Sequence, residues 1–352
     1  MSDEIYTASG SPNIALIKYW GRRDDLLNLP NNSSISMTLG DGLTTTTSVM
    51  FSDRIKEDAV YINGKRQDYK AANDEKSGFM LKAIEYMREA AKTNARLLAV
   101  SKNSFPSDAG LASSASGAAT MVYALNEALG LKMQQKELSI VARQISGSAC
   151  RSIFGGIVKW NKGSRSDGSD SFAEQVVPAD YWPDLVDIIA IVSESKKKVS
   201  SSEGHKVTVR TSALYRARPP FAEAGVAKVI EAVHEKDFNS LAELIMRDSN
   251  DMHATMLDSW PPIIYLNDAS KGIIGAIHEI NQSHGENMAA YTFDAGPNGH
   301  IITLRKYEAE VTERLSKAVG IKSIITSGIG SGPRKSEDCL ITKELLAENE
   351  RQ

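Results

Sequence analysis

One stretch constrains the fold of this chain more than any other, and it reads SKNSFPSDAGLASSASGAAT over residues 101–120. A loop of small residues around Gly110 leads into Ser113 and Ser114 and then into an Ala-rich segment, 115–130, with the composition of a helix. A loop that opens a helix leaves backbone N–H groups unpaired, and the helix dipole makes that end attractive to anions. The pattern is typical of a phosphate-binding loop and equally of an ordinary Ser-capped helix.

The length of 352 residues predicts two domains, because it exceeds what one hydrophobic core usually supports. We place their boundary where residues 181–183 precede a new strand-like run, which gives domains at 1–184 and 185–352. The formal net charge of −3 offers no electrostatic reason to expect nucleic acid or a membrane surface as partner.

Cysteine usage and the N-terminus indicate the compartment. Cys150 and Cys339 cannot make a disulfide scaffold, and their spacing fits no metal motif. The N-terminus lacks a basic start followed by an apolar core, and no apolar run is long enough to span a bilayer. We therefore expect a cytoplasmic protein.

The periodicity of apolar residues predicts a mixture of strands and helices, an α+β chain. Expected strands cover 13–19, 34–39, 43–51, 59–63, 96–101, 157–160, 186–192, 289–294, 301–304 and 323–327. Expected helices cover 77–92, 115–130, most of 211–281 with a break at 260–262, and a solvated helix at 343–352. The Gly-Asp-Gly turn at 40–42 predicts a hairpin between its two flanking strands.

Several polar residues stand where a ligand could reach them. Arg151 lies among small residues with no acidic neighbour in sequence, so it either pairs with a distant carboxylate or holds a substrate carboxylate or phosphate. Asp294 ends a strand beside Gly296, as a ligand-facing or a turn-capping residue does. The Lys- and Ser-rich stretch 193–204 suits either solvent or phosphate oxygens. His253, in the run DSNDMH, has no metal spacing and is interpreted as structural, so no metal site is predicted.

Six segments in order along the chain carry a family resemblance, and they read NIALIKYWG, NLPNNSSIS, FPSDAGLASSASG, SGSACRS, DSNDMHATMLDSWPP and YTFDAGPN. Together they resemble the mevalonate diphosphate decarboxylase family. That family is a branch of the superfamily of small-molecule kinases that includes galactokinase, homoserine kinase and mevalonate kinase. The resemblance implies the two-domain α+β fold of that superfamily, an active site in the inter-domain cleft, and a homodimer.

The resemblance also implies roles for individual residues. By motif position, Asp294 matches the catalytic aspartate, Arg151 the residue that holds the substrate carboxylate, and Lys18 the lysine of the catalytic centre. Positions that contact the 5-phosphoryl end of the substrate are matched by Tyr19, Arg22, Ser148 and Ser201. The phosphate or nucleotide loop is assigned to Ser107, Asp108, Gly110, Ser113, Ser114 and Lys197. In this chemistry a carboxylate stabilises a carbocation-like centre, or takes the hydroxyl proton in a kinase step, while cations screen the departing phosphate.

Two residues depart from the family pattern. Arg22 stands where lysine is usual, which keeps the charge but replaces a point donor with a planar fork. Asp108 stands where the phosphate loop usually has small neutral residues. Like charges about 4 Å apart repel by on the order of 4 kcal/mol at an effective dielectric near 20. Unless Asp108 points away, is neutralised or caps the helix, ATP binding is expected to be weak.

We therefore predict a decarboxylase of a phosphorylated mevalonate in isoprenoid precursor synthesis. The main hypothesis is the ATP-independent reaction, in which mevalonate 3,5-bisphosphate gives isopentenyl phosphate, CO2 and phosphate with no cofactor. The alternative is the ATP-dependent enzyme, which converts mevalonate 5-diphosphate and Mg-ATP to isopentenyl diphosphate, ADP, phosphate and CO2. A non-catalytic sensor of an isoprenoid phosphate is a third hypothesis. Retention of Asp294, Arg151 and Lys18 argues against this sensor, and retention of the aspartate and lysine argues against a pure kinase.

Overall fold

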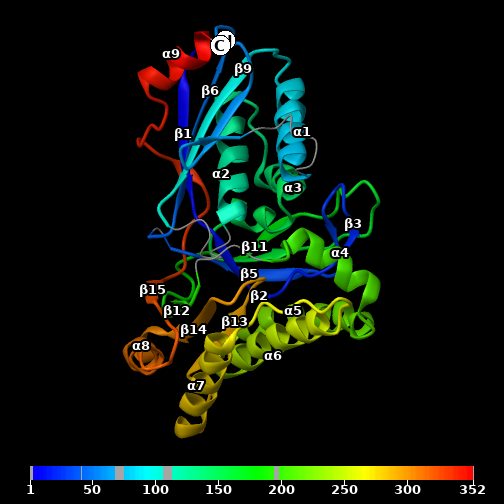
Figure 1. The fold of residues 1–352 in the computed structure, drawn as a ribbon, viewed down its shortest axis with the longest axis vertical. Coiled ribbons are helices and arrows are strands. Elements are labelled where there is room, and N and C mark those ends of the chain that lie inside the picture. Colours follow the sequence, from blue (N-terminus) through cyan, green and yellow to red (C-terminus); the bar gives the residue numbers. More distant parts are fainter. Residues whose placement is uncertain (1–2, 41, 68–74, 106–112, 194–197, 352) are drawn as a thin grey trace.

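The computed structural model describes residues 3–40, 42–67, 75–105, 113–193 and 198–351, and it arranges them in stacked layers (Figure 1). The strands are β1 (Ile5–Gly10), β2 (Asn13–Ile17), β3 (Arg22–Asp24), β4 (Leu29–Pro30), β5 (Ser34–Thr38), β6 (Thr45–Ser52), β7 (Ala59–Ile62), β8 (Lys65–Arg66), β9 (Arg96–Asn103), β10 (Ile157–Trp160), β11 (Ala173–Val177), β12 (Leu185–Ile191), β13 (Ala289–Phe293), β14 (Gly299–Leu304), β15 (Ser323–Ser327) and β16 (Arg334–Lys335). The α-helices are α1 (Glu75–Ala90), α2 (Ser113–Ala128), α3 (Gln135–Ile145), α4 (Ser201–Thr211), α5 (Arg218–Glu235), α6 (Phe238–Leu257), α7 (Asp268–His284), α8 (Glu308–Ser316) and α9 (Lys343–Arg351). Short 3₁₀ helices are η1 (Gly147–Ile153), η2 (Leu214–Ala217) and η3 (Arg305–Tyr307).

The first layer is a six-stranded sheet in the order β16-β1-β6-β9-β7-β8, with α1, α2 and α3 on one face (Figure 1). Side chains alternate between the two faces of its strands, as the strand period of two requires. In β6, Val49 and Phe51 join the core beneath the helices, whereas Met50 joins a smaller cluster on the opposite face.

The C-terminal segment covers that opposite face. Ile341 is buried there against β6 and β9, and Leu345 and Leu346 of α9 pack beside it. Asn349 is also buried, and its backbone oxygen accepts a hydrogen bond from the Lys56 amide. The predicted C-terminal helix is confirmed, but the expectation that it is solvated is wrong, because its leucines cover apolar residues of the sheet.

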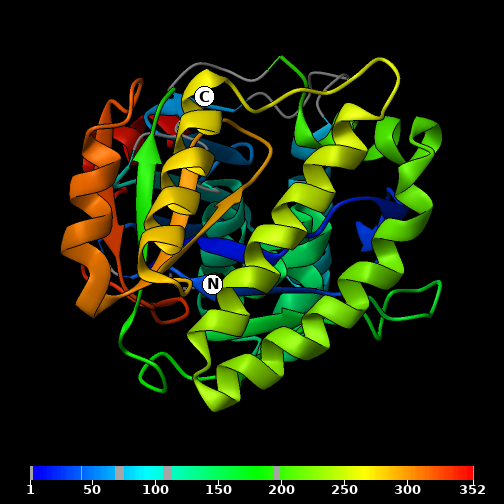
Figure 2. The ribbon, with the colours of Figure 1, turned by 90° about the horizontal axis from the view of Figure 1, so that it is seen from below.

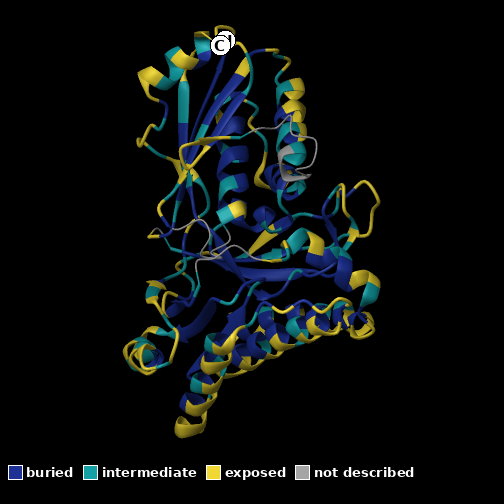
Figure 3. Ribbon diagram, viewed as in Figure 1, coloured by how far each residue is buried: buried dark blue, intermediate teal, exposed yellow. Residues whose placement is uncertain are grey.

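The second and third sheets lie below the first and share one hydrophobic core with helices α5, α6 and α7. Their strand orders are β11-β10-β5-β2 and β13-β14-β12-β15. Strands β2 and β5 are buried along their whole length (Figure 3). Figure 2, seen from below, shows α5, α6 and α7 side by side across the near face of this core. The other face of the second sheet packs against α2 and α3, so this sheet lies between two helical layers.

The predicted hairpin at residues 40–42 is wrong. Strand β5 pairs with β2 and β10 in the second sheet, whereas β6 pairs with β1 and β9 in the first. The chain therefore crosses from one sheet to the other at this turn. The glycines at 40 and 42 predict a break between two strands, but they do not predict which strands pair. Pairing depends on strands far away in sequence, which the local sequence does not specify.

The other expected strands and helices are present at or close to their predicted positions, and the α+β class is confirmed. One boundary matters for function: the strand expected over 13–19 ends at Ile17, which leaves Lys18 just beyond it. The domain boundary at 184/185 stays a prediction, and strand β16 pairs with β1 across it. No helix among the described residues has the length and apolar character needed to cross a membrane.

We predict that Ile341→Ala lowers the free energy of unfolding by about 2 kcal/mol or more, because it leaves a cavity between the sheet and the C-terminal segment. Urea unfolding measures the change. Val319→Ala is the control, since Val319 is 91% exposed and its truncation removes little packing. Equal stability losses in the two variants would show that the C-terminal segment does not dock on the sheet.

Candidate active site

The centre of the site is an ion pair between Lys18 and Asp294, which are 276 residues apart in the chain. Lys18 follows β2 and Asp294 follows β13, so two strand ends bring them together. The Lys18 Nζ lies 2.6 Å from Asp294 Oδ1, with the lysine side chain 2% exposed and the aspartate 34% exposed. The ammonium is enclosed by protein while the carboxylate remains accessible to a ligand.

Arg151 lies in the 3₁₀ helix η1 and is buried. Its Nε donates to Asn13 Oδ1 at 3.2 Å, and its Nη1 donates to Ser34 Oγ at 2.5 Å. Because Ile17 pairs with Ile35, Ser34 and Lys18 lie side by side at adjacent strand ends. Arg151 therefore donates to a residue that lies beside Lys18.

The charge of Arg151 has no carboxylate partner within ion-pair distance among the described residues. Burial lowers the pKa of Arg151, and the charge of Asp294 opposes that shift. A buried cation needs hydrogen bonds or an anionic partner to compensate the loss of water. The first sequence hypothesis for Arg151, a pair with a distant carboxylate, is thus not met among the described residues, and the second, binding of an anionic ligand, stays a prediction.

A second group of predicted residues gathers beside the first. Arg22 Nε donates to the Tyr19 hydroxyl at 2.7 Å, and Arg22 Nη2 lies 3.4 Å from Ser202 Oγ, next to Ser201 at the start of α4. Ser148 is adjacent to Gly147, where a Cβ atom would lie 2.7 Å from Tyr19 Cε1. Tyr19 and Arg22 thus form one wall beside Lys18, and Gly147 and Ser202, the sequence neighbours of Ser148 and Ser201, contact that wall. The missing side chain of Gly147 allows its close approach to Tyr19.

His205 of α4 belongs to this wall and was not predicted from the sequence. Its ring lies between those of Tyr19 and Trp20, with centroid distances of 4.5 and 4.3 Å. The Gly21 amide donates to His205 Nδ1 at 2.6 Å. Burial and, secondarily, the charge of Arg22 lower the pKa of His205 well below its ordinary value of 6.5. The ring is therefore a neutral support for the segment that carries Tyr19 and Arg22.

The predicted phosphate loop is described only in part. Ser113 and Ser114 begin α2, and the Ser116 hydroxyl donates to the Ser113 carbonyl oxygen at 3.3 Å. Four further residues assigned to the loop lie outside the described residues, namely Ser107, Asp108, Gly110 and Lys197. Their roles stay predictions.

His253 is a structural histidine, as interpreted from the sequence. Its Nε2 donates to the Phe293 carbonyl oxygen at 3.3 Å, and burial lowers the pKa of His253 to about 4. Within the described ranges, no group of three or more His, Cys, Asp or Glu side chains is placed to hold a metal ion.

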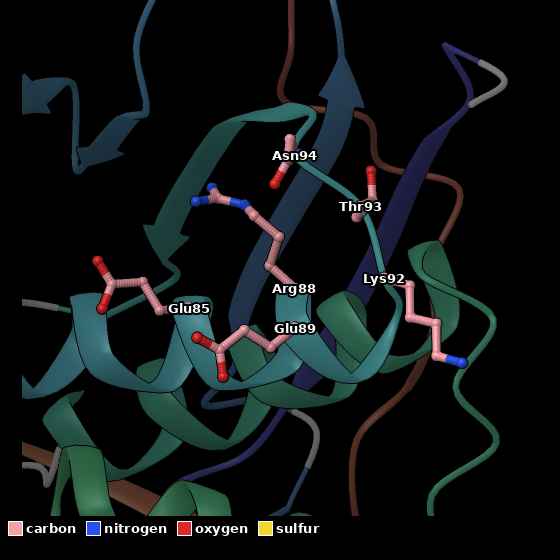
Figure 4. A pocket seen from close by; sticks show the side chains of 6 residues that line it. All are labelled: Glu85, Arg88, Glu89, Lys92, Thr93 and Asn94. Atoms are coloured by element: carbon pink, nitrogen blue, oxygen red, sulfur yellow. The ribbon is translucent and has the colours of Figure 1, made fainter.

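A surface depression elsewhere plays no part in this site (Figure 4). It lies at the C-terminal end of α1 and is lined by Glu85, Arg88, Glu89, Lys92, Thr93 and Asn94. Arg88 is bound there to Asp58 at 2.7 Å. None of the predicted site residues lines it.

The layered fold and the site together define a class of protein. An ion pair accessible to a ligand, a buried arginine and a tyrosine–arginine wall lie where the sheets meet, in the two-domain fold shared by small-molecule kinases and related decarboxylases. Two protein-family models match the chain. The model of the diphosphomevalonate decarboxylase-like N-terminal domain matches residues 10–173, and the model of the mevalonate 5-diphosphate decarboxylase C-terminal domain matches residues 187–349.

Individual relatives agree over nearly the whole chain. The diphosphomevalonate decarboxylase of Aspergillus fumigatus is 40% identical over an alignment 394 positions long, and the alignment covers 97% of each chain. A solved structure of the mevalonate diphosphate decarboxylase from Enterococcus faecalis has a TM-score of 0.84 and 35% identity to this chain. That structure concerns the ATP-binding mechanism mediated by mevalonate diphosphate. Another, described as "MDDEF in complex with MVAPP, AMPPCP and Magnesium", has the same values, and both cover 95% of this chain and 99% of the other. The chain belongs to the diphosphomevalonate decarboxylase family.

These comparisons confirm the predicted family, fold and carboxy-lyase class, and on the use of ATP they support the alternative hypothesis better than the main one. The relatives are diphosphate enzymes, so they favour the ATP-dependent alternative over the bisphosphate reaction. The hypothesis of an ATP-independent enzyme rested on Asp108. A single carboxylate in a loop is weak evidence because sequence does not fix the direction of its side chain.

We predict that stability falls on acidification below about pH 6.5, in part through His205. The folded protein keeps this ring neutral, whereas the unfolded chain binds a proton below the ordinary pKa of 6.5, so acid favours unfolding. Each such proton adds about 1.4 kcal/mol per pH unit to the slope of the free energy of unfolding against pH. Urea unfolding of wild type and His205→Gln from pH 5 to 8 measures it.

The variant should show a shallower slope below pH 6.5 and a parallel curve above pH 7. His253 contributes in the same direction between pH 6.5 and about 4, so the slope in His205→Gln is reduced and not abolished. An unchanged acid slope in the variant would mean that His205 titrates alike in the folded and unfolded chain.

Proposed function

We propose that this protein is an ATP-dependent decarboxylase of mevalonate 5-diphosphate that produces isopentenyl diphosphate, CO2, ADP and phosphate. The observation that carries the proposal is the buried Arg151 guanidinium, held by the neutral side chains of Asn13 and Ser34 near the Lys18–Asp294 pair. This arrangement suits a substrate with a carboxylate next to a reacting tertiary carbon. The family membership supports the same reaction.

Each of the three charged residues has a separate task in the proposed reaction. Arg151 binds the substrate carboxylate as a planar fork and fixes the bond that will break. Asp294 accepts the proton of the tertiary hydroxyl during its phosphorylation and passes it to solvent, to which its side chain is 34% exposed. The regenerated carboxylate then stabilises the cationic carbon as phosphate departs. Lys18 holds the Asp294 carboxylate in place and adds positive charge next to the departing phosphate. The electron pair of the broken C–C bond forms the alkene, and CO2 leaves.

The remaining predicted residues bind the 5-diphosphate of the substrate and the phosphates of ATP. Tyr19, Arg22, Ser148 and Ser201 form the wall for the 5-diphosphate, where the Arg22 fork supplies charge-assisted hydrogen bonds. Mg-ATP is the co-substrate, and we assign its phosphates to the loop before α2, whose first residues are Ser113 and Ser114. We also expect a cytoplasmic homodimer, on the resemblance and on cysteine usage.

The reaction itself is tested by CO2 release from purified protein. With mevalonate 5-diphosphate and Mg-ATP we expect CO2 and ADP in equal amounts. With mevalonate 3,5-bisphosphate and no nucleotide we expect none, because the proposed enzyme performs its own phosphorylation. Turnover of the bisphosphate alone would refute ATP dependence, and release from neither substrate would revive a non-catalytic binding role.

We predict that Arg151→Lys lowers kcat/KM for mevalonate 5-diphosphate about 10- to 100-fold, since lysine cannot reproduce the hydrogen bonds of the guanidinium fork to a carboxylate. The matched control is Arg143→Lys. Arg143 is an equally buried arginine, but it donates to the backbone oxygens of Leu27 and Gly168, and it belongs to none of the predicted positions.

Both variants should lose stability, which thermal unfolding reports, but only Arg151→Lys should lose kcat/KM to this extent. A similar loss of kcat/KM in both would point to general destabilisation and remove the case for a carboxylate-binding Arg151.

A further inference from the structure

One short segment of helix α6, residues 248–253, contacts both strand ends that carry the Lys18–Asp294 pair. It is the DSNDMH run that the sequence singled out around His253. Asp248 contacts the backbone of Lys18, while Ser249 and His253 contact the backbone of Phe293, the residue before Asp294. The reaction proposed above assigns no task to this segment.

On the Lys18 side, side chains bind the backbone amide and carbonyl group of Lys18, which lies beyond the last residue of its strand. Strand β2 ends at Ile17, and its pairing with β5 is irregular between Ala15 and Ile17. The Lys18 amide donates to Asp248 Oδ2 at 2.7 Å. The Lys18 carbonyl oxygen accepts from Arg218 Nη2 and from Asn32 Nδ2, each at 3.0 Å. Both backbone groups of Lys18 are therefore held.

Asp248 and Arg218 hold one another as well. Arg218 Nη1 lies 2.6 Å from Asp248 Oδ1, and both side chains are fully buried. Arg218 also pairs with Asp251 at 2.7 Å. Burial acts to lower the pKa of Arg218, but the two carboxylates outweigh it and raise that pKa. The Asp248 carboxylate thus uses one oxygen for Arg218 and the other for Lys18, which an amide of the same shape cannot do, because it has only one acceptor oxygen.

On the Asp294 side, α6 binds an edge strand. Strand β13 is at the end of its sheet, and β14 is its only partner among the described strands. The Phe293 amide donates to Ser249 Oγ at 3.1 Å, and the Phe293 carbonyl oxygen accepts from His253 at 3.3 Å. Two residues earlier in the strand, Tyr291 is hydrogen-bonded to Asn250 of α6 through the two side chains. The strand end that delivers Asp294 is therefore fixed to the same turns of α6.

We propose that Asp248 and Ser249, with Arg218, are positioning residues that set the geometry of the Lys18–Asp294 pair through helix α6. The role of that pair in catalysis rests on the function proposed above, but the geometric role of α6 can be measured without turnover. Because the two partners come from strands of different sheets, neither sheet alone fixes their separation. The rigid helix between them does.

The first test compares Asp248→Asn with Asp251→Asn. Both variants remove a carboxylate from the same arginine, but Asp251 has no hydrogen bond to Lys18 or to β13 among the described residues. Crystal structures report the distance from Lys18 Nζ to Asp294 Oδ1. We expect it to exceed 4 Å in Asp248→Asn and to remain near 2.6 Å in Asp251→Asn.

Kinetics provides the second readout. A displacement of about 1 Å at a catalytic group costs on the order of 100-fold in rate, so kcat of Asp248→Asn should fall 10- to 100-fold with little change in KM. Asp251→Asn should retain kcat within about twofold. In a Lys18→Met background, Asp248→Asn should cause no further loss, because its effect acts through Lys18.

Ser249→Ala is the second variant, should Asp248→Asn fold poorly. It removes one hydroxyl from the Asp294 side. Its control is Thr255→Val on the same helix, which removes a buried hydroxyl that donates only to the Met252 carbonyl oxygen in the described hydrogen bonds. We expect a lower kcat and a displaced Asp294 in Ser249→Ala alone.

The two proposals fail in different ways. If the Lys18–Asp294 distance is unchanged in both Asp248→Asn and Ser249→Ala, or if Asp248→Asn and Lys18→Met lower kcat independently, the positioning role is refuted even when the wild type is active. If the wild type turns over no mevalonate phosphate but the pair separates in Asp248→Asn and not in Asp251→Asn, the positioning role stands and the proposed reaction falls.

Discussion

The structure depends on how it accommodates three cations, Lys18, Arg151 and Arg218, buried where the second sheet meets the helices and strand β13. A buried charge costs several kcal/mol unless a partner and hydrogen bonds compensate it. Asp294 compensates Lys18, and Asp248 with Asp251 compensates Arg218. Arg151 differs from the other two because the described residues offer it only neutral partners at hydrogen-bond distance. In the proposed reaction, the carboxylate of the substrate supplies the anionic partner that Arg151 otherwise lacks.

Helix α5 extends the same principle to the loop beside Lys18. Arg218, at its start, binds the Lys18 carbonyl oxygen, and Glu223 one turn later accepts a hydrogen bond from the Ser33 amide at 2.5 Å. Ser33 precedes Ser34, which accepts from Arg151. The helix that fixes Lys18 thus also fixes a partner of Arg151. Helices from the second half of the chain therefore set the geometry of residues from the first half, and neither half forms the site by itself.

Local sequence patterns located most elements of this fold, since strand and helix periods are properties of neighbouring residues. They failed where the answer lay in distant contacts. The turn at 40–42 connects two sheets, because β5 and β6 each find partners far away in sequence. Likewise, Arg218 and His205 carried no local signal, although one holds Lys18 and the other supports Tyr19. The sequence surroundings of Arg151 and Asp294 mark them as candidate ligand residues, whereas Lys18 is identified through the family motif alone. The structure supplies the contacts that link the three.

The neutral partners of Arg151 suit the proposed reaction for a reason of charge. Arg151 attracts the substrate carboxylate more strongly than neutral CO2, so its attraction alone opposes decarboxylation. The driving force must come from the centre where charge develops, near Asp294 and Lys18, as phosphate departs. Once CO2 leaves, Arg151 loses its counterion in a buried environment. Asn13 and Ser34 then keep the guanidinium hydrogen-bonded and oriented, so that it need not rearrange before it binds the next carboxylate.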